Sequence, residues 1–176
     1  MLKVTRPHSA TSHSLKTIRN ITIADAAQIC SIYNYFIENT AITFELTPVE
    51  EPEMARRITE ITKNYPWIVY EENGEIIGYA YASKWRDRPA YRFVAETTVY
   101  IRQGDEGKGI GSLLYTDLLR KLKMKHIHAA IGCITLPNPA SVTLHEKLGF
   151  ANVAHFREVG FKFDQWQDVG FWQLML

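Results

Sequence analysis

The sequence predicts an α/β (α+β) domain in which a mixed, mostly antiparallel central sheet of about seven strands is flanked by about four helices. Two observations carry this prediction. The expected elements follow the order β-α-α-β-β-β-α-β-α-β-β, and the strands run in hairpins before they alternate with helices, which argues against a doubly wound parallel sheet. The 176 residues, 46% of them hydrophobic, suffice for one core. We expect a flexible arm over residues 1–16 and a single domain over residues 17–176.

The first elements are marked by helix-start signals. A strand at 17–22 precedes a helix at about 23–39, because Thr22 and Asp25 have the spacing of a capping box and apolar residues then recur at helical intervals. The segment Thr47-Pro48-Val49-Glu50 predicts the start of a second helix, since Thr can cap a helix and Pro suits the first helical position. This helix is expected to end near residue 63.

A hairpin comes next. Trp67-Ile68-Val69-Tyr70 is expected to be a strand, Asn73-Gly74 supplies the positive-φ pair of a tight turn, and residues 76–83 form the return strand. A loop over 84–92 leads to a further strand at about 93–101.

The second half alternates helices with strands. A helix at about 109–124 has apolar residues at four-residue steps, and a buried strand follows at 128–134. Asn138-Pro139 opens the last helix, and Gly149 suits the left-handed position at its end. Two strands, at about 151–158 and 167–175, complete the domain.

Composition excludes several classes of protein. Lys and Arg number 20 and Asp and Glu 19, so the formal net charge of +1 gives no global field for nucleic acid. No apolar run reaches the roughly 18–20 residues that cross a bilayer. Cys30 and Cys133 cannot build a disulfide framework or a four-thiolate zinc site, and the first residues lack an apolar signal core. We expect a cytoplasmic protein with no metal and no nucleic-acid or membrane partner.

The strongest chemical signal is the turn Gly107-Lys108-Gly109-Ile110-Gly111-Ser112, between a strand and a helix. Unpaired backbone N–H groups and the helix dipole favour phosphate there, and this interpretation outweighs a plain tight turn. A P-loop is excluded, because Ile110 and Gly111 stand where Lys and Ser/Thr are needed. A Rossmann fingerprint also fails, since its third glycine position holds Leu114 or Ser112.

The glycine turn belongs to a wider set of motifs. They are Tyr65-Pro66-Trp67, Ala95-Glu96-Thr97-Thr98-Val99-Tyr100-Ile101, Leu136-Pro137-Asn138, Leu144-His145-Glu146-Lys147-Leu148-Gly149-Phe150 and Trp166-Gln167-Asp168-Val169-Gly170-Phe171-Trp172-Gln173. Over residues 17–176 the chain resembles the GNAT N-acetyltransferases, most closely those that acetylate phosphinothricin and methionine sulfoximine or sulfone. One position departs from the pattern: Glu106 stands where these loops usually have Arg or Gln, and we expect its side chain to point away from the diphosphate.

The resemblance implies the GNAT fold and acetyl-CoA as cosubstrate. The backbone of Val99, Tyr100 and Ile101 would pair with the pantetheine arm like an added strand, and a backbone N–H there would polarise the thioester carbonyl. The diphosphate would contact the backbone of Gly107, Lys108, Gly109, Ile110, Gly111 and Ser112. Asn138 would contact the cofactor where the strands splay apart, and it can also serve as a helix N-cap.

The resemblance also implies two proton-transfer residues. Glu96 lies in an otherwise apolar segment, where a carboxylate is costly unless it is functional or paired, and we expect it to be the base; the alternative is a structural partner for Arg88 or Arg92. His145 stands where many GNAT enzymes carry a tyrosine that protonates the leaving thiolate and where the phosphinothricin-type members carry His. We expect it to be the acid; the alternative is a surface histidine beside Glu146. Cys133, in an apolar strand, is expected to be inert, so transfer is direct within a ternary complex.

The acceptor pocket is expected to hold aromatic and basic residues. The candidates are Phe36, Phe44, Trp85, Arg86, Pro89, Ala90 and Tyr91, several of which could equally be core or surface residues. An Arg of the basic loop 84–92 would bind the carboxylate or phosphinate of a small amino-acid acceptor. A different amine or protein N-terminus as acceptor, and a non-catalytic CoA-binding module, remain alternatives. Family members commonly form homodimers, to which the strand segment Phe171-Trp172 could contribute.

Overall fold

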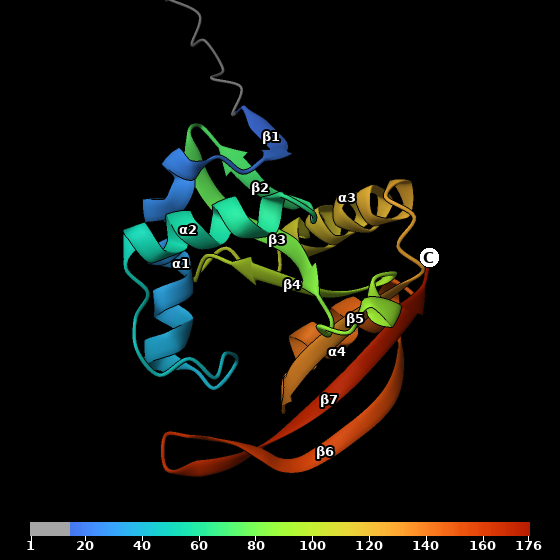
Figure 1. Cartoon of the computed structure of the whole chain (residues 1–176). Helices are drawn as coiled ribbons and strands as arrows, with labels where there is room; N and C mark the ends of the chain where they lie inside the picture. The colour runs from blue at the N-terminus through green and yellow to red at the C-terminus, as the bar shows by residue number, and fades with distance from the viewer. Residues whose placement is uncertain (1–14) are drawn as a thin grey trace, which may run out of the picture.

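A computed structural model describes residues 15–176 and confirms the expected seven strands and four helices (Figure 1). The strands are β1 Lys16–Asn20, β2 Trp67–Glu72, β3 Glu75–Lys84, β4 Val94–Ile101, β5 Ala129–Leu136, β6 Ala151–Lys162 and β7 Gln165–Met175. The helices are α1 Ala26–Asn39, α2 Glu51–Thr62, α3 Ile110–Met124 and α4 Pro139–Lys147. Residues 1–14 of the expected arm lie outside the described residues, and residue 16 already belongs to β1.

The sheet has the order β1-β2-β3-β4-β5-β7-β6. Among the strands of residues 15–176 only β4 and β5 run parallel, and every other neighbouring pair is antiparallel. The mixed sheet agrees with the element order: the parallel strands β4 and β5 are joined through α3, whereas β1 and β2, joined through α1 and α2, run antiparallel.

Two apolar cores lie on opposite faces of the sheet. On one face α3 and α4 pack against the sheet, with Leu114, Leu118 and Leu122 fully buried in the core. On the other face α1 and α2 cover β2, β3 and β4, with Ile29 and Ile58 buried. Figure 1 shows α1 and α2 together over this face, while the long β6–β7 hairpin extends below them.

The predicted start of the second helix is wrong by three residues. The helix α2 begins at Glu51, and Pro52 occupies its first turn. The amide side chain of Asn34 accepts a hydrogen bond from the N–H of Val49 at 2.8 Å and donates one to its carbonyl at 2.9 Å. Because the backbone of Val49 is engaged by this side chain from α1, residues 40–50 form a loop that crosses from α1 to α2.

The two predicted positive-φ glycines are confirmed, and a further turn lacks glycine. Gly149, after the end of α4, has a φ of +91°. Asn73 and Gly74 have φ values of +54° and +87°, as a tight hairpin requires. The β6–β7 hairpin is longer than expected, because Phe163 and Asp164 make its turn at φ values of +52° and +56° without a glycine. In the part of the chain that the structure describes, no helix is both long and apolar enough to span a membrane.

Candidate active site

The parallel strands β4 and β5 separate halfway along their length. They pair from Val94 opposite Ala129 to Thr97 opposite Gly132, and beyond these pairs β4 is bonded to β3 and β5 to β7. The β5-facing edge of β4 after Thr97 therefore has no strand partner among the described residues. Such an edge can bind an extended chain by adding it as a further strand.

A cavity opens at this gap. It is lined by residues of β4 and β5, of the helices α3 and α4, and of the loop between α1 and α2: Thr97, Thr98, Val99, Tyr100, Cys133, Ile134, Thr135, Tyr115, Asn138, Ser141, His145 and Ile42. Of the residues expected to contact the cofactor, Val99, Tyr100 and Asn138 lie here. The side chain of Asn138 accepts from the Ser141 N–H at 3.1 Å, so it caps α4 as well.

The glycine turn forms an uncapped helix N-terminus. Gly107 and Gly109 have φ values of +76° and +79°, which favour glycine, and a Cβ at either position would meet nothing within 4 Å. Gly109 is the N-cap of α3, and no side chain bonds the amides of the first helical turn among the described residues. These amides and the positive end of the helix dipole are free to bind an anion.

The charged residues of the turn are paired among themselves. The carboxylate of Glu106 accepts from the N–H of Gly104 at 2.7 Å, so it turns back into the preceding loop. Lys108 forms an ion pair with Asp105, which also pairs with Arg102 at 2.7 Å. The anion-binding capacity of the turn therefore comes from backbone N–H groups, with Lys108 held beside them.

Glu96 lies on β4, opposite Ser83 of β3 and Ile131 of β5. Its neighbour Thr97 contacts α3, so Glu96 points to the other face, the one that carries α1 and α2. Burial raises the pKa of its carboxyl above the usual value. No hydrogen bond or ion pair engages it within residues 15–176, so the alternative of a structural pair with Arg88 or Arg92 is wrong.

His145 belongs to a buried hydrogen-bonded chain. It is only 3% exposed, so the alternative of a surface histidine is wrong. Its Nδ1 lies 2.7 Å from the carbonyl of Ser141, which can only accept, and we therefore assign the proton to Nδ1. Burial lowers the pKa of the ring, although the bond to Ser141 acts in the opposite direction, so the ring is neutral at neutral pH.

Sequence reasoning missed the partner of this histidine. The Nε2 atom of neutral His145 accepts from the hydroxyl of Tyr115 at 3.0 Å, and this hydroxyl lies 3.3 Å from Oγ1 of Thr97. Burial holds the pKa of the Tyr115 phenol above its usual value. Tyr115, on α3, sits at helical spacing among core leucines, which gave no signal of a polar role. Its hydroxyl lies at the wall of the cavity, with its proton directed to His145.

The expected acceptor residues fall into two groups. Trp85 packs edge-on against Phe171 of β7 at 5.7 Å, and the guanidinium of Arg86 lies over the rings of Trp85 and Tyr91 at 5.3 and 5.9 Å. Phe171 pairs with Cys133, which lies on the same face as Glu96, so the loop 84–92 reaches across this face. Pro89 and Ala90 belong to its short 3-10 helix.

The other two aromatic candidates lie elsewhere. Phe36 is a core residue packed on Tyr100 at 5.0 Å, and it does not line the cavity. The ring of Phe44 lies on Gly160 of β6, where an added Cβ would come within 2.3 Å of it. Cys133 was expected to be buried, but it is exposed and lines the cavity because its side chain faces the open half of β5.

A splayed parallel strand pair beside an uncapped, glycine-rich helix N-terminus defines a site for a phosphate-bearing thioester donor, as the sequence motifs implied. Residues 18–170 match the acetyltransferase (GNAT) domain. The phosphinothricin N-acetyltransferase of Streptomyces viridochromogenes is 39% identical over 156 residues, which cover 89% of this chain and 85% of the relative. The L-methionine sulfoximine/L-methionine sulfone acetyltransferase of Salmonella typhimurium is 35% identical over 161 residues, covering 91% and 94%.

A solved structure agrees with these matches. The phosphinothricin acetyltransferase of Sinorhizobium meliloti in complex with AcCoA superimposes with a TM-score of 0.88 at 39% identity, covering 92% of this chain and 88% of that one. The chain belongs to the GNAT acetyltransferase family. The expected fold and the expected enzyme class, an acetyltransferase, are confirmed. Among residues 15–176 no group of three or more His, Cys, Asp or Glu side chains is placed to hold a metal ion.

Proposed function

We propose that the protein transfers the acetyl group of acetyl-CoA directly to the amine of a small amino acid or an analogue of the phosphinothricin or methionine sulfoximine type. The observation that carries this proposal is the unpartnered carboxylate of Glu96 beside the free edge of β4. An acetyl donor laid along that edge and an amine above Glu96 meet where the β4–β5 ladder ends. The names of the relatives support an amino-acid analogue as acceptor.

The reaction needs a base that accepts a proton from the ammonium group, and a hydrogen-bond donor that polarises the thioester carbonyl oxygen. Glu96 accepts a proton from the ammonium group, directly or through a water, and its raised pKa brings it closer to neutral pH, where a base is most effective. The amine nitrogen then attacks the carbonyl carbon and a C–N bond forms. The nitrogen gives its second proton to water, and the C–S bond breaks with the electron pair on sulfur. A backbone N–H of the free edge at Val99 polarises the carbonyl.

Tyr115 stabilises the leaving sulfur. The Tyr115 O–H first donates to Nε2 of His145, and as charge develops on the departing sulfur the hydroxyl turns and donates to the thiolate instead. A thiol has a pKa near 8.5, below that of a buried phenol, so the phenol keeps its proton. His145 cannot be the direct proton donor that the sequence suggested, because its ring is neutral and its one N–H is given to Ser141. It is a positioning residue that orients the Tyr115 hydroxyl.

Direct transfer is favoured over an acetyl-cysteine intermediate. Cys133 is the thiol that lines the cavity. Its side chain is open to the cavity, but the surrounding walls partly desolvate the sulfur, and this desolvation, together with the charge of nearby Glu96, raises its pKa to about 12. A thiol of that pKa is almost wholly protonated at neutral pH and is a poor nucleophile in that form. Cys133 therefore lines the cavity without acting as a nucleophile.

The loop that binds the cosubstrate can be tested at Gly109. Gly109→Val places a β-branched residue at φ +79°, which costs about 1–2 kcal/mol and shifts the amides that follow it. We expect the KM for acetyl-CoA to rise about tenfold. Gly74→Val is the matched control, because Gly74 has φ +87°, no atom within 4 Å and a place in the distant β2–β3 turn. An unchanged KM in folded Gly109→Val would contradict the role of the loop.

The acceptor class is tested by charge. The guanidinium groups of Arg86 and Arg88 have no carboxylate partner within the described residues, so they are available to an acceptor carboxylate or phosphinate. We expect kcat/KM for an amino acid to exceed that for its decarboxylated amine at least about tenfold. A thiol reporter across amino acids and their sulfone, sulfoximine and phosphinate analogues measures this. Equal kcat/KM for an amino acid and its decarboxylated amine would contradict the proposed contact between an Arg and the acceptor carboxylate. Absence of turnover with every amine would support a non-catalytic CoA-binding module.

We further propose a homodimer in the cytoplasm. Phe156, Phe161, Phe163 and Trp166 are exposed on the β6–β7 hairpin and support an interface there. The suggested contribution of Trp172 is wrong, because this residue is 4% exposed and belongs to the core of the monomer. Both cysteines are free thiols, which is consistent with a reducing compartment. Light scattering in solution gives the molar mass that checks the dimer.

A further inference from the structure

The loop over residues 40–46 forms one wall of the cavity. Ile42 lines the cavity beside Thr98 and Tyr100 of β4. This loop leaves α1 at its C-terminal end and lies on the face of the sheet that carries Glu96, so it borders the space that the acceptor must enter. What fixes this loop therefore fixes the shape of the acceptor site.

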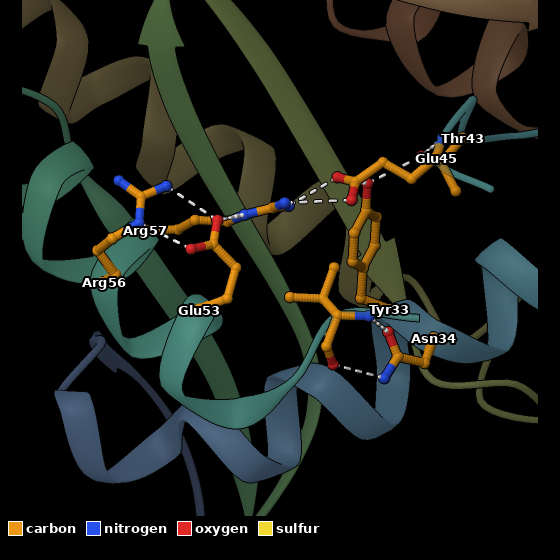
Figure 2. Close-up of polar contacts among 8 residues, drawn as sticks. Tyr33, Asn34, Thr43, Glu45, Glu53, Arg56 and Arg57 are labelled. Carbon is orange, nitrogen blue, oxygen red and sulfur yellow. Dashed lines mark hydrogen bonds and ion pairs between the residues drawn. The ribbon is translucent and has the colours of Figure 1, made fainter. Parts of the chain in front are cut away.

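On one side the loop is fixed by α1 and α2 (Figure 2). The carboxylate of Glu45 accepts two hydrogen bonds from the guanidinium of Arg57, at 2.6 and 3.1 Å, and a third from the hydroxyl of Tyr33 at 2.8 Å. The Tyr33 hydroxyl also lies 2.8 Å from Oγ1 of Thr43. Arg57, from α2, thus fixes the carboxylate of Glu45, and this carboxylate in turn accepts the hydrogen bond by which Tyr33 binds the loop.

On the other side the loop is fixed by β6. The ammonium of Lys162 donates to the carbonyl of Thr43 at 2.8 Å, and Lys162 is buried. The ring of Phe44 covers Gly160 of the same strand. The loop is therefore held at Thr43 and Glu45 by side chains of three elements, α1, α2 and β6, and Ile42 lies directly before these attachments.

The Glu45–Arg57 pair has a geometry that resists displacement. Partial burial acts to raise the pKa of the Glu45 carboxyl, but the hydrogen bonds from Arg57 and Tyr33 outweigh it, so the pKa lies below its usual value and the group is ionised at neutral pH. The two side chains are about one third exposed, and pairs with this exposure contribute little to global stability. The bidentate contact instead restricts orientation.

We propose that Arg57 is a positioning residue for acceptor binding: through Glu45 and Tyr33 it holds the loop that carries Ile42 against the acceptor. This inference rests on the proposed function. Arg57 lies on α2, outside the cavity, and its hydrogen bonds within the described residues go to Glu45 and Glu53 and not to the cosubstrate elements β4 and α3. It therefore controls the acceptor KM and not the KM for acetyl-CoA.

The chain offers a matched pair of variants. Arg56 and Arg57 are neighbours on α2 and both bond Glu53, but only Arg57 reaches Glu45 (Figure 2). We expect Arg57→Gln to raise the acceptor KM roughly five- to tenfold, the loss of one charge-assisted contact, with the KM for acetyl-CoA unchanged. Arg56→Gln should leave both constants unchanged. Arg57→Lys keeps the charge without the fork and should recover part of the acceptor affinity.

A second measurement separates this inference from the proposed function. Hydrogen exchange of the backbone amides of residues 42–46 needs no substrate, and we expect faster exchange in Arg57→Gln than in Arg56→Gln, with equal exchange in β3 and α3. If exchange is faster in Arg57→Gln but the wild type turns over no acceptor, the proposed acetyltransferase function is refuted, while the role of Arg57 in holding the loop is supported. Equal exchange in the two variants, or a wild-type acceptor KM in Arg57→Gln, overturns the inference.

Discussion

Replacing Glu96 by glutamine is expected to lower kcat/KM for the amino-acid acceptor by about 10²–10⁴-fold at neutral pH, the usual loss when a general base is removed. Glutamine has the size of glutamate and fits the same place on β4, but it cannot accept the ammonium proton. No partner within the described residues is lost with the carboxylate, and burial already disfavours its charge, so the fold should tolerate the change. The KM for acetyl-CoA should stay near the wild-type value.

The pH profile makes this prediction specific. The deficit of Glu96→Gln should shrink as the pH rises, because more of the acceptor is then already a free amine. The acid limb of the wild-type profile should lie above the usual glutamate range, since burial raises the pKa of Glu96. Glu60→Gln, on the exposed surface of α2, is the control. Near-normal rates in Glu96→Gln at neutral pH would falsify the base assignment.

Tyr115→Phe is expected to lower kcat about 10- to 100-fold, the effect of one hydrogen bond to a developing charge. The ring of Tyr115 is fully buried and phenylalanine fills the same volume. Unlike the loss of a base, this deficit should not be relieved by alkali, because no proton has to be removed by the phenol. The measurement is kcat against pH at saturating acetyl-CoA.

His145→Ala provides the comparison for the same hydrogen-bonded chain. If His145 acts through Tyr115, its removal slows turnover, and the double variant is no slower than Tyr115→Phe, since both changes disable one unit. Strictly additive losses would contradict the positioning role. Recovery of His145→Ala at high pH would show that His145 is a base, reached from the amine through the hydroxyl of Tyr115.

The sequence predicted the order of elements because local signals are strong in this chain. The Thr22/Asp25 capping box and the Asn73-Gly74 turn are made by residues close together in the sequence, so a short segment contains all the interactions that determine them. Glu96 and His145 were found through motifs. Their surroundings depend on side chains from other elements, and spacing along one element does not reveal these.

The wrong or missing predictions share that cause. The start of α2 is displaced by Asn34, fifteen residues earlier, which competes for the backbone of Val49. Tyr115 has the helical spacing of a core residue, and only the fold brings His145 to its hydroxyl. Arg57 looks like an ordinary surface residue of an amphipathic helix until the loop after α1 places Glu45 beside it.

The separation of β4 from β5 has a consequence for water. Past Thr97 and Gly132, two rows of backbone N–H and C=O groups face a gap in the middle of a sheet, not its rim. Polar groups in such a place must be hydrated when no ligand is present, because leaving them dry is costly. Binding of an extended, amide-bearing arm exchanges those waters for direct hydrogen bonds, so the substrate itself dries the reaction centre and closes the sheet around the bond that is to be broken.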